Sequence, residues 1–250
     1  LGIPSAYLAD GPHRLAMAPK REFDSHTYYA TEFPSSTTVA ATFDPEAAFQ
    51  VGQALGREVK DYGLDVLLAP GVNLMRNVLC GRNHEYYSED PLVVGKIAAA
   101  YINGIQSQGT GTCIKHFAVN NQETNRQGVD AIVSQRALRE IYLRGFEIAV
   151  RESQPWTVMS SYNKVNGVFA QESHGLLTDI LRNDWGFKGM VTTDWWTRAE
   201  HYKEIKAGND VKMGTGFPER VKKAMEMGQL GRPELEHCAR RVLELILKID

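Results

Sequence analysis

Short apolar runs alternate with longer amphipathic stretches along most of the chain. Seven such runs are Ala6–Ala9, Thr38–Ala41, Val66–Ala69, Thr112–Ile114, Trp156–Met159, Met190–Thr192 and Val211–Met213. They do not alternate strictly between apolar and polar positions, which is typical of strands that are covered on both faces. We therefore predict a strand at each run.

The stretches between these runs carry helix start and stop signals. Asp44–Pro45 and Asp90–Pro91 each place a capping residue before a proline, and Gly63 and Gly109 follow where those helices should end. Two further helices are predicted from the spacing of apolar residues. One follows Ser134 and has an apolar face of Leu138, Ile141, Tyr142 and Phe146; the other begins near Pro233 and has a buried stripe of Leu235, Cys238, Ala239, Val242, Ile246 and Ile249.

Strand followed by helix, repeated along the chain, predicts an α/β fold with a parallel sheet. No GxGxxG follows the first strand and no GxxxxGK[ST] is present, so a doubly wound nucleotide-binding sheet is disfavoured. The favoured architecture is a TIM-like (β/α)8 barrel. Seven strands are visible where such a barrel needs eight, so we expect the first unit to lie upstream of Leu1.

Composition and charge argue against several classes of protein, namely nucleic-acid-binding, membrane-spanning and metal-dependent proteins. The chain has 250 residues, 43% apolar and 23% charged, which is ordinary for a globular domain of barrel size. A net charge of −2 argues against a basic nucleic-acid surface, and no apolar run is long enough to cross a membrane. There is no HExxH motif and no clustered Cys/His set, so we expect neither a metal nor another cofactor.

Polar residues follow the predicted strands, and in barrels of this type the active site is built from the loops at those strand ends. The residues concerned are Asp10, His13, Asn73, Arg76, Arg82, Asn83, His84, Glu85, Asp90, Lys115, His116, Asn120, Asn121, Glu123, Arg126, Ser160, Tyr162, Asn163, Asp194, Trp195 and Trp196. Carboxylates, cations and amides suit the hydroxyls of a sugar, and flat aromatic faces suit its C–H surface. The pattern therefore favours a polyhydroxylated ligand over a metal.

Asp194 is the sharpest catalytic candidate in this set. It stands at the exit of a buried strand, where an ionised carboxylate suits attack on an anomeric carbon. Lys115 and His116 are neighbours on a predicted strand, and the side chains of neighbouring strand residues face opposite sides of the sheet. If both serve one site, the strand has to end or kink there.

Several long motifs, in order, resemble glycoside hydrolase family 3, and they look closest to its β-glucosidase branch. They are Asp10-Gly11-Pro12, Ala69–Asn73, Leu79–Asn83 running on to Tyr87–Pro91, Lys115-His116-Phe117, Asn121–Arg126, Arg136–Tyr142, Met159–Asn163 and Thr193-Asp194-Trp195. The resemblance covers essentially the whole chain and implies a catalytic barrel domain over residues 1–250, incomplete at its N-terminus. The chain departs from the family at Arg14-Leu15-Ala16, where Gly-Leu-Arg is common.

The resemblance also implies roles in a retaining, exo-acting β-glucosidase. Asp194 would be the nucleophile, Tyr162 would orient it and Trp195 would stack at the site wall. The hydroxyls of the terminal sugar would be held by Asp10, Arg82, Lys115, His116 and Arg126. The acid/base Glu would come from a separate α/β sandwich domain outside this chain, so the expected partners are β-glucosides and that domain; Glu123 is the alternative acid within the chain.

Two other functions stay open on the sequence alone. A sugar-binding or catalytically incomplete module would have the same pocket without an acid. A Schiff-base aldolase would use Lys115 at the end of its strand. Xylose, galactose and β-glucan ends remain alternatives to glucose.

Overall fold

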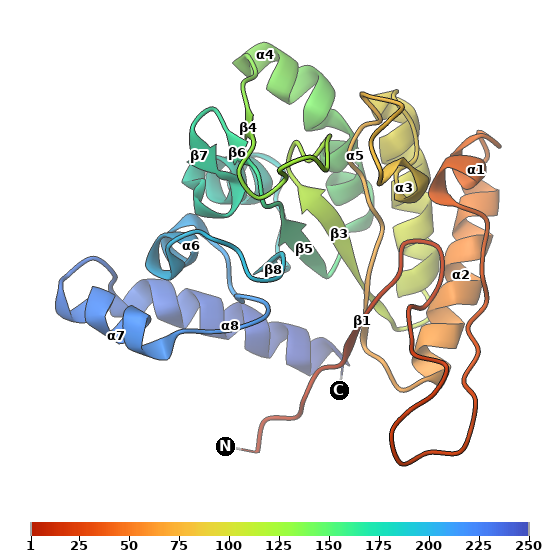
Figure 1. Ribbon diagram of the computed structural model, residues 1–250, viewed down its shortest axis with the longest axis horizontal. Coiled ribbons are helices and arrows are strands. Elements are labelled where there is room, and N and C mark those ends of the chain that lie inside the picture. The colour runs from red at the N-terminus through yellow and green to blue at the C-terminus, as the bar shows by residue number, and fades with distance from the viewer. Residues whose placement is uncertain (1, 250) are drawn as a thin grey trace.

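The computed structural model describes residues 2–249 and is centred on one parallel sheet (Figure 1). Its strands, in spatial order, are β1 (Leu8–Asp10), β2 (Val66–Leu68), β3 (Gly111–Phe117), β5 (Thr157–Ser160) and β8 (Met190–Thr193). Neighbouring strands are successive in the chain, apart from the short excursions that carry the other strands, which is the order that strand–helix units produce in a barrel. The α/β class and the TIM-like architecture are confirmed, with five strands forming part of a barrel; the unit expected upstream of Leu1 lies outside the described residues.

One predicted strand is wrong. The run Thr38–Ala41 lies in a short helix, α1 (Ser36–Ala40), instead. The hydroxyl of Ser35 accepts a hydrogen bond from the Thr38 N–H at 3.3 Å, so the residue before the run caps a helix. Val39 is buried within that helix, which explains its apolar character without a strand.

The last predicted strand, Val211–Met213, is reduced to a single parallel bridge between Val211 and Thr192 on the outer edge of β8. The Lys212 side chain turns into the protein, where its ammonium is 2.8 Å from the buried Glu204 carboxylate. Beyond Val211 the chain is also held by the Met213 N–H, which donates to the Thr193 hydroxyl of β8 at 3.0 Å.

The main helices cover one side of the sheet in order, with α2 (Pro45–Asp61) packed on α3 (Pro91–Gln106) and α3 on α5 (Arg144–Ser153) (Figure 1). Asp44 and Asp90 cap α2 and α3 as predicted, and Gly63 and Gly109 follow them with φ of +70° and +76°. These left-handed conformations favour glycine, which is why the stop signals could be recognised.

The predicted face of the helix after Ser134 needs one correction. The segment Leu138–Tyr142 forms a π-helical turn, closed by the N–H of Leu143 donating to the carbonyl of Leu138 at 2.9 Å. The extra residue in this turn shifts the spacing of the buried stripe. Leu143 is therefore fully buried, whereas Ile141, which the regular spacing places inside, is 40% exposed.

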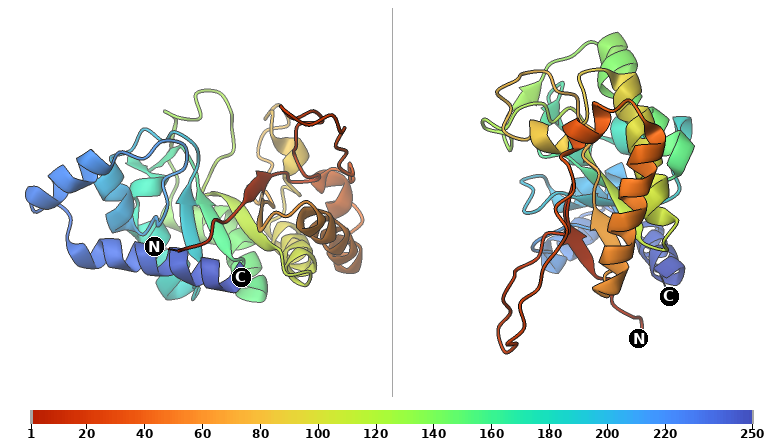
Figure 2. Two further views of the ribbon diagram at one scale, coloured as in Figure 1. Left: turned by 90° about the horizontal axis from the view of Figure 1, so that it is seen from below. Right: turned by 90° about the vertical axis from the view of Figure 1, so that its right-hand side faces the viewer.

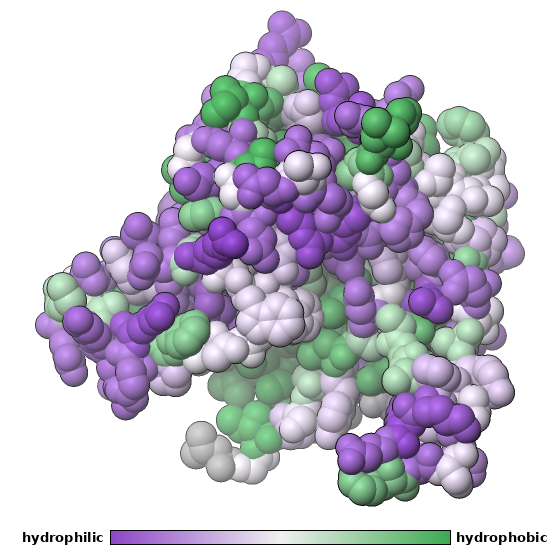
Figure 3. Space-filling model, viewed as in Figure 1, coloured by the Kyte–Doolittle hydropathy of each residue, from purple (hydrophilic) through white to green (hydrophobic). Residues whose placement is uncertain are grey.

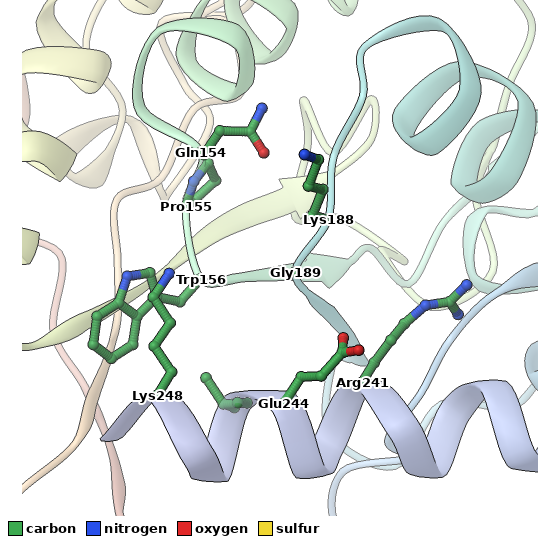
Figure 4. A pocket seen from close by; sticks show the side chains of 9 residues that line it. Gln154, Pro155, Trp156, Lys188, Gly189, Arg241, Glu244 and Lys248 are labelled. Carbon is green, nitrogen blue, oxygen red and sulfur yellow. The ribbon is translucent and has the colours of Figure 1, made fainter. Parts of the chain in front are cut away.

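The last helix, α8 (Arg232–Ile249), runs across the lower side of the molecule (Figure 2). Its stripe is confirmed at Cys238 and Val242 and continues through Leu245, while Ala239 is exposed. A cavity of about 390 Å³ separates α8 from the segments that lead into β5 and β8, and the Lys248 ammonium lies 4.6 Å from the Trp156 ring there (Figure 4). This cavity is at the amino ends of the strands.

Smaller elements decorate the opposite end of the sheet. They are a second sheet of β4 (Asp130–Ala131), β6 (Lys164–Val165) and β7 (Val168–Phe169), with the short helical segments α4 (Gln135–Ala137) and Ala170–Glu172. The helical segment Gly175–Asp184 instead packs on the buried core between β5 and β8, and α6 (His201–Ala207) contacts α7 (Pro218–Glu226) and α8. A long excursion between β1 and α1 extends away from the body of the molecule (Figure 2). Within residues 2–249, no helix combines the length and apolarity needed to cross a bilayer.

Candidate active site

A second cavity of about 390 Å³ lies at the carboxyl ends of the strands. It is lined by Leu8, Asp10, Leu68, Arg82, Lys115, His116, Arg126, Met159, Asp194, Trp195 and Trp196. In the space-filling view, hydrophilic residues form a band across the middle and upper part of the molecule, interrupted by a few hydrophobic clusters (Figure 3). The residues to which the resemblance assigns roles all line this cavity except Tyr162, which stands behind Asp194 and Arg126. Other polar residues that follow the strands, such as Asn73, Glu85 and Glu123, do not line it.

Asp194 is held rigidly at the exit of β8. Its N–H donates to the Ser160 carbonyl at 3.1 Å, and one carboxylate oxygen accepts the Trp195 N–H at 2.7 Å. The residue is only 8% exposed, and this burial raises the pKa of its carboxyl. The Trp195 N–H and the Tyr162 hydroxyl oppose that rise of the pKa, because both favour the ionised form.

Lys115 and His116 both line the cavity although they are neighbours on β3. The pairing of β3 with β5 shifts register between Ile114 and Phe117. The kink that the sequence required for a shared site is therefore present. The buried Lys115 ammonium is 2.6 Å from the carboxylate of Asp10, which is 62% exposed at its side chain and faces the cavity.

His116 is buried next to the nucleophile candidate, with its Nε2 3.9 Å from an Asp194 oxygen and its Nδ1 3.2 Å from the Tyr86 hydroxyl. Asn73 holds its backbone from both sides, accepting the His116 N–H at 2.7 Å and donating to the His116 carbonyl at 2.9 Å. Burial, reinforced by nearby cations including Arg82, lowers the pKa of His116 well below its ordinary value. The imidazole is therefore neutral at neutral pH and suited to hydrogen bonding with hydroxyl groups.

The two arginines of the site are each tied to a carboxylate. Arg82 pairs with the buried Glu85, and Arg126 donates to Glu123 at 2.9 Å. The Arg126 guanidinium also lies over the Tyr162 ring, 4.9 Å from its centroid. These pairs orient the guanidinium groups and leave their remaining donors for a ligand.

The predicted set missed the apolar lining, which comes from Leu8, Leu68 and Met159. Leu8 could have been found, because it stands two residues before Asp10 and alternate strand residues share a face. Trp196 also lines the cavity. The sequence placed it in the loop after β8 but carried no signal that separated its position from that of Trp195.

Comparison with known proteins agrees with this geometry. Residues 24–245 match the family described as the N-terminal domain of glycosyl hydrolase family 3. The chain is 48% identical over 236 residues to β-glucosidase A of Butyrivibrio fibrisolvens, covering 94% of this chain and 28% of that protein. It is 41% identical to an exo-α-(1→6)-L-arabinopyranosidase of Bifidobacterium longum, covering 99% of this chain and 33% of that protein.

The fold is likewise similar to that of β-glucosidase 3B from Thermotoga neapolitana, solved in complex with α-D-glucose. The TM-score is 0.96 at 49% sequence identity, over 99% of this chain and 36% of that one. The chain thus spans about a third of the length of the relatives it matches. Because the family model matches nearly the whole chain, the chain belongs to glycosyl hydrolase family 3 and corresponds to the N-terminal domain of that family.

Proposed function

We propose that this chain is the nucleophile-bearing domain of a retaining, exo-acting β-glycosidase that releases terminal β-D-glucosyl residues. The observation that carries the proposal is Asp194: a buried carboxylate, fixed by the Trp195 N–H, at the wall of a cavity rich in hydroxyl-binding groups. Relatives with this domain are named β-glucosidases, which supports the same reaction.

In the proposed double displacement, Asp194 attacks the anomeric carbon and the bond to the leaving group breaks, giving a glycosyl-enzyme. Water then hydrolyses that intermediate with retention of configuration. Lys115 and Asp10 form a paired donor and acceptor for adjacent hydroxyls, while the neutral His116 and the two arginines contact the others. A pocket with this many charge-assisted hydrogen bonds selects one pyranose stereochemistry through its hydroxyl pattern.

A retaining enzyme needs a second carboxyl group about 5–5.5 Å from the nucleophile. Among the described residues that line the cavity, Asp10 is the one other carboxylate, and it is bound to Lys115; Glu123, outside the lining, is bound to Arg126. We therefore propose that the acid/base Glu comes from a second, α/β sandwich domain. The chain covers only about a third of the length of these relatives, so the relatives have ample length for a further domain.

The two alternative functions are weaker. Lys115 is committed to an ion pair with Asp10 in the same cavity as Asp194, an arrangement that suits holding a hydroxyl rather than attacking a carbonyl. A sugar-binding module would not require a buried carboxylate that a backbone N–H fixes at the cavity wall. Borohydride trapping at Lys115 would support the aldolase, and sugar binding without any covalent intermediate would support the module.

The proposal is tested by trapping the glycosyl-enzyme in the full-length protein. A 2,4-dinitrophenyl 2-deoxy-2-fluoro-β-D-glucoside should release dinitrophenolate in a burst and leave the fluoroglucosyl group on the peptide that contains Asp194. Comparing this reagent with the corresponding α-L-arabinopyranoside and β-D-xyloside would show which sugar the enzyme prefers. A label on another residue, or a product of inverted configuration, would refute the assignment.

A further prediction concerns the pH profile. The Tyr162 hydroxyl lowers the pKa of Asp194, so Tyr162→Phe should raise that pKa and move the acidic limb of kcat/KM to higher pH. The shift is expected to be about half a pH unit to one unit, corresponding to a single hydrogen bond. Tyr142→Phe, in the π-helical turn, serves as a control and should leave the limb in place. An unchanged limb in Tyr162→Phe would show that the phenol does not act on Asp194.

A further inference from the structure

We propose that Trp196 is the platform on which the leaving group rests, and that it determines which leaving groups the enzyme prefers. This inference rests on the proposed glycosidase function. It concerns the part of the substrate that departs, whereas the polar groups described above contact the sugar that is transferred. The preferred leaving group would have a flat apolar face, as an aromatic ring or the C–H side of a second pyranose has.

Trp196 differs sharply from its neighbours in exposure. Asp194 is 8% exposed and Trp195 is half-buried against the apolar cluster that includes Leu68 and Met159, whereas Trp196 is 66% exposed; all three line the cavity. It therefore stands at the mouth, on the solvent side of the nucleophile. An aromatic face at that position can cover apolar substrate surface only outside the polar pocket.

The indole is held in place by the backbone and by a glycine. Trp196 has φ of +53°, and its N–H donates to the Met213 carbonyl at 3.2 Å. Its ring packs directly on Gly214, where an added Cβ would lie 2.7 Å from Cδ1 and 2.8 Å from Nε1. No side chain other than hydrogen fits at Gly214 while the ring keeps this position.

The next residue is anchored in the interior. The Thr197 hydroxyl donates to Glu204 at 2.6 Å and accepts from the Lys212 ammonium at 2.7 Å, and Glu204 and Lys212 are themselves paired and buried. With Asp194 fixed on one side and Thr197 on the other, Trp196 is exposed without being free to collapse onto the surface. A large aromatic ring preorganised next to a nucleophile binds with little loss of conformational entropy.

The test uses the full-length protein and three β-D-glucosides that share the glucosyl group: methyl, 4-nitrophenyl and cellobiose. Trp196→Ala should lower kcat/KM roughly 10-fold for the aryl glucoside and for cellobiose, the scale of one lost aromatic contact, and less than about 2-fold for the methyl glucoside. Inhibition by glucose should be unchanged. Trp196→Phe should retain most of the preference. Loss for the aryl glucoside alone would assign the platform to aromatic leaving groups, and loss for cellobiose to sugars.

A kinetic readout separates this role from a general loosening of the site. The leaving group has departed before the glycosyl-enzyme is hydrolysed, so the rate of that second step should be the same in Trp196→Ala and wild type. Equal losses for all three substrates, or a slowed second step, would overturn the inference and leave the proposed function standing. Absence of glycosidase activity in the wild-type protein would instead refute the proposed function.

Gly214→Ala provides an independent variant, because the added methyl displaces the Trp196 ring without removing it. It should reproduce the loss of preference, and the double variant with Trp196→Ala should lose no more preference than Trp196→Ala alone. Gly228→Ala is the matched control: Gly228 also has a positive φ of +68°, but an added Cβ there meets nothing within 4 Å. Altered preference in Gly228→Ala, or additive losses in the double variant, would contradict the proposal.

Discussion

Asp194→Asn is expected to abolish turnover of β-glucosides, lowering kcat by roughly 10⁴-fold or more, as is typical when a covalent nucleophile is removed. The amide keeps an oxygen that can accept the Trp195 N–H, so the loop after β8 should keep its conformation. Steady-state kinetics of the full-length protein measure the loss, and glucose binding by calorimetry should persist. Turnover within about 10-fold of wild type would exclude Asp194 as the nucleophile.

The same substitution should raise the melting temperature at neutral pH. Burial raises the pKa of Asp194 in the folded state above its value in the unfolded chain, so the folded protein is less stable when this group is ionised. The destabilisation grows as the pH rises from the unfolded pKa to the folded one and is complete above the latter. The stabilising effect of Asn should therefore be present at pH 7 and disappear in acid below the ordinary range of aspartate.

Glu22→Gln is the control for this stability effect, because Glu22 is an exposed carboxylate in the excursion between β1 and α1. It should leave the melting temperature unchanged at both pH values. A melting temperature for Asp194→Asn that falls at pH 7, or that rises equally at every pH, would show that the buried charge does not destabilise the fold. The expected result identifies Asp194 as a residue retained for chemistry at a cost in stability.

Lys212→Met should destabilise the fold by about 3–5 kcal/mol, because it leaves a buried carboxylate without its partner. The Lys212 and Glu204 side chains are 4% and 1% exposed, and the ammonium is 2.8 Å from both carboxylate oxygens. Burial already raises the pKa of Glu204, and Lys212 is the main group that opposes this. Thermal unfolding should show a fall of about 10 °C in the melting temperature of this domain.

A double variant distinguishes a lost charge partner from lost packing. Glu204→Leu in the Lys212→Met background removes the unpaired carboxylate and should recover much of the stability. Lys222→Met is the matched control, since Lys222 and its partner Glu219 are 65% and 83% exposed, and such a pair contributes at most about 1 kcal/mol. If Lys212→Met were no more harmful than Lys222→Met, the buried pair would have no special role in holding the loop that carries Trp196.

Most of the sheet could be predicted because each buried strand has a recognisable local sequence pattern. The runs at Val66, Trp156 and Met190 are apolar on both faces and are followed at once by polar groups, so both the strand and the residues at its end can be found from local sequence. The helix boundaries at Gly63 and Gly109 could be found for the same reason. The run Thr38–Ala41 was predicted wrongly as a strand. Its four apolar or β-branched residues closely follow the capping residue Ser35, and such a sequence fits a capped helix as well as a strand.

The sequence by itself determined the α/β class, the order of strands and helices and the identity of almost every polar group at the site, because these depend on periodicity and on residues adjacent to strand ends. The tertiary structure alone decided how those groups meet. The kink in β3 brings Lys115 and His116 into one cavity, and Asn73 reaches across to hold His116. Gly214 and the buried Glu204–Lys212 pair hold Trp196 at the mouth. These arrangements join residues far apart in the chain through packing and burial, which no local pattern of sequence encodes.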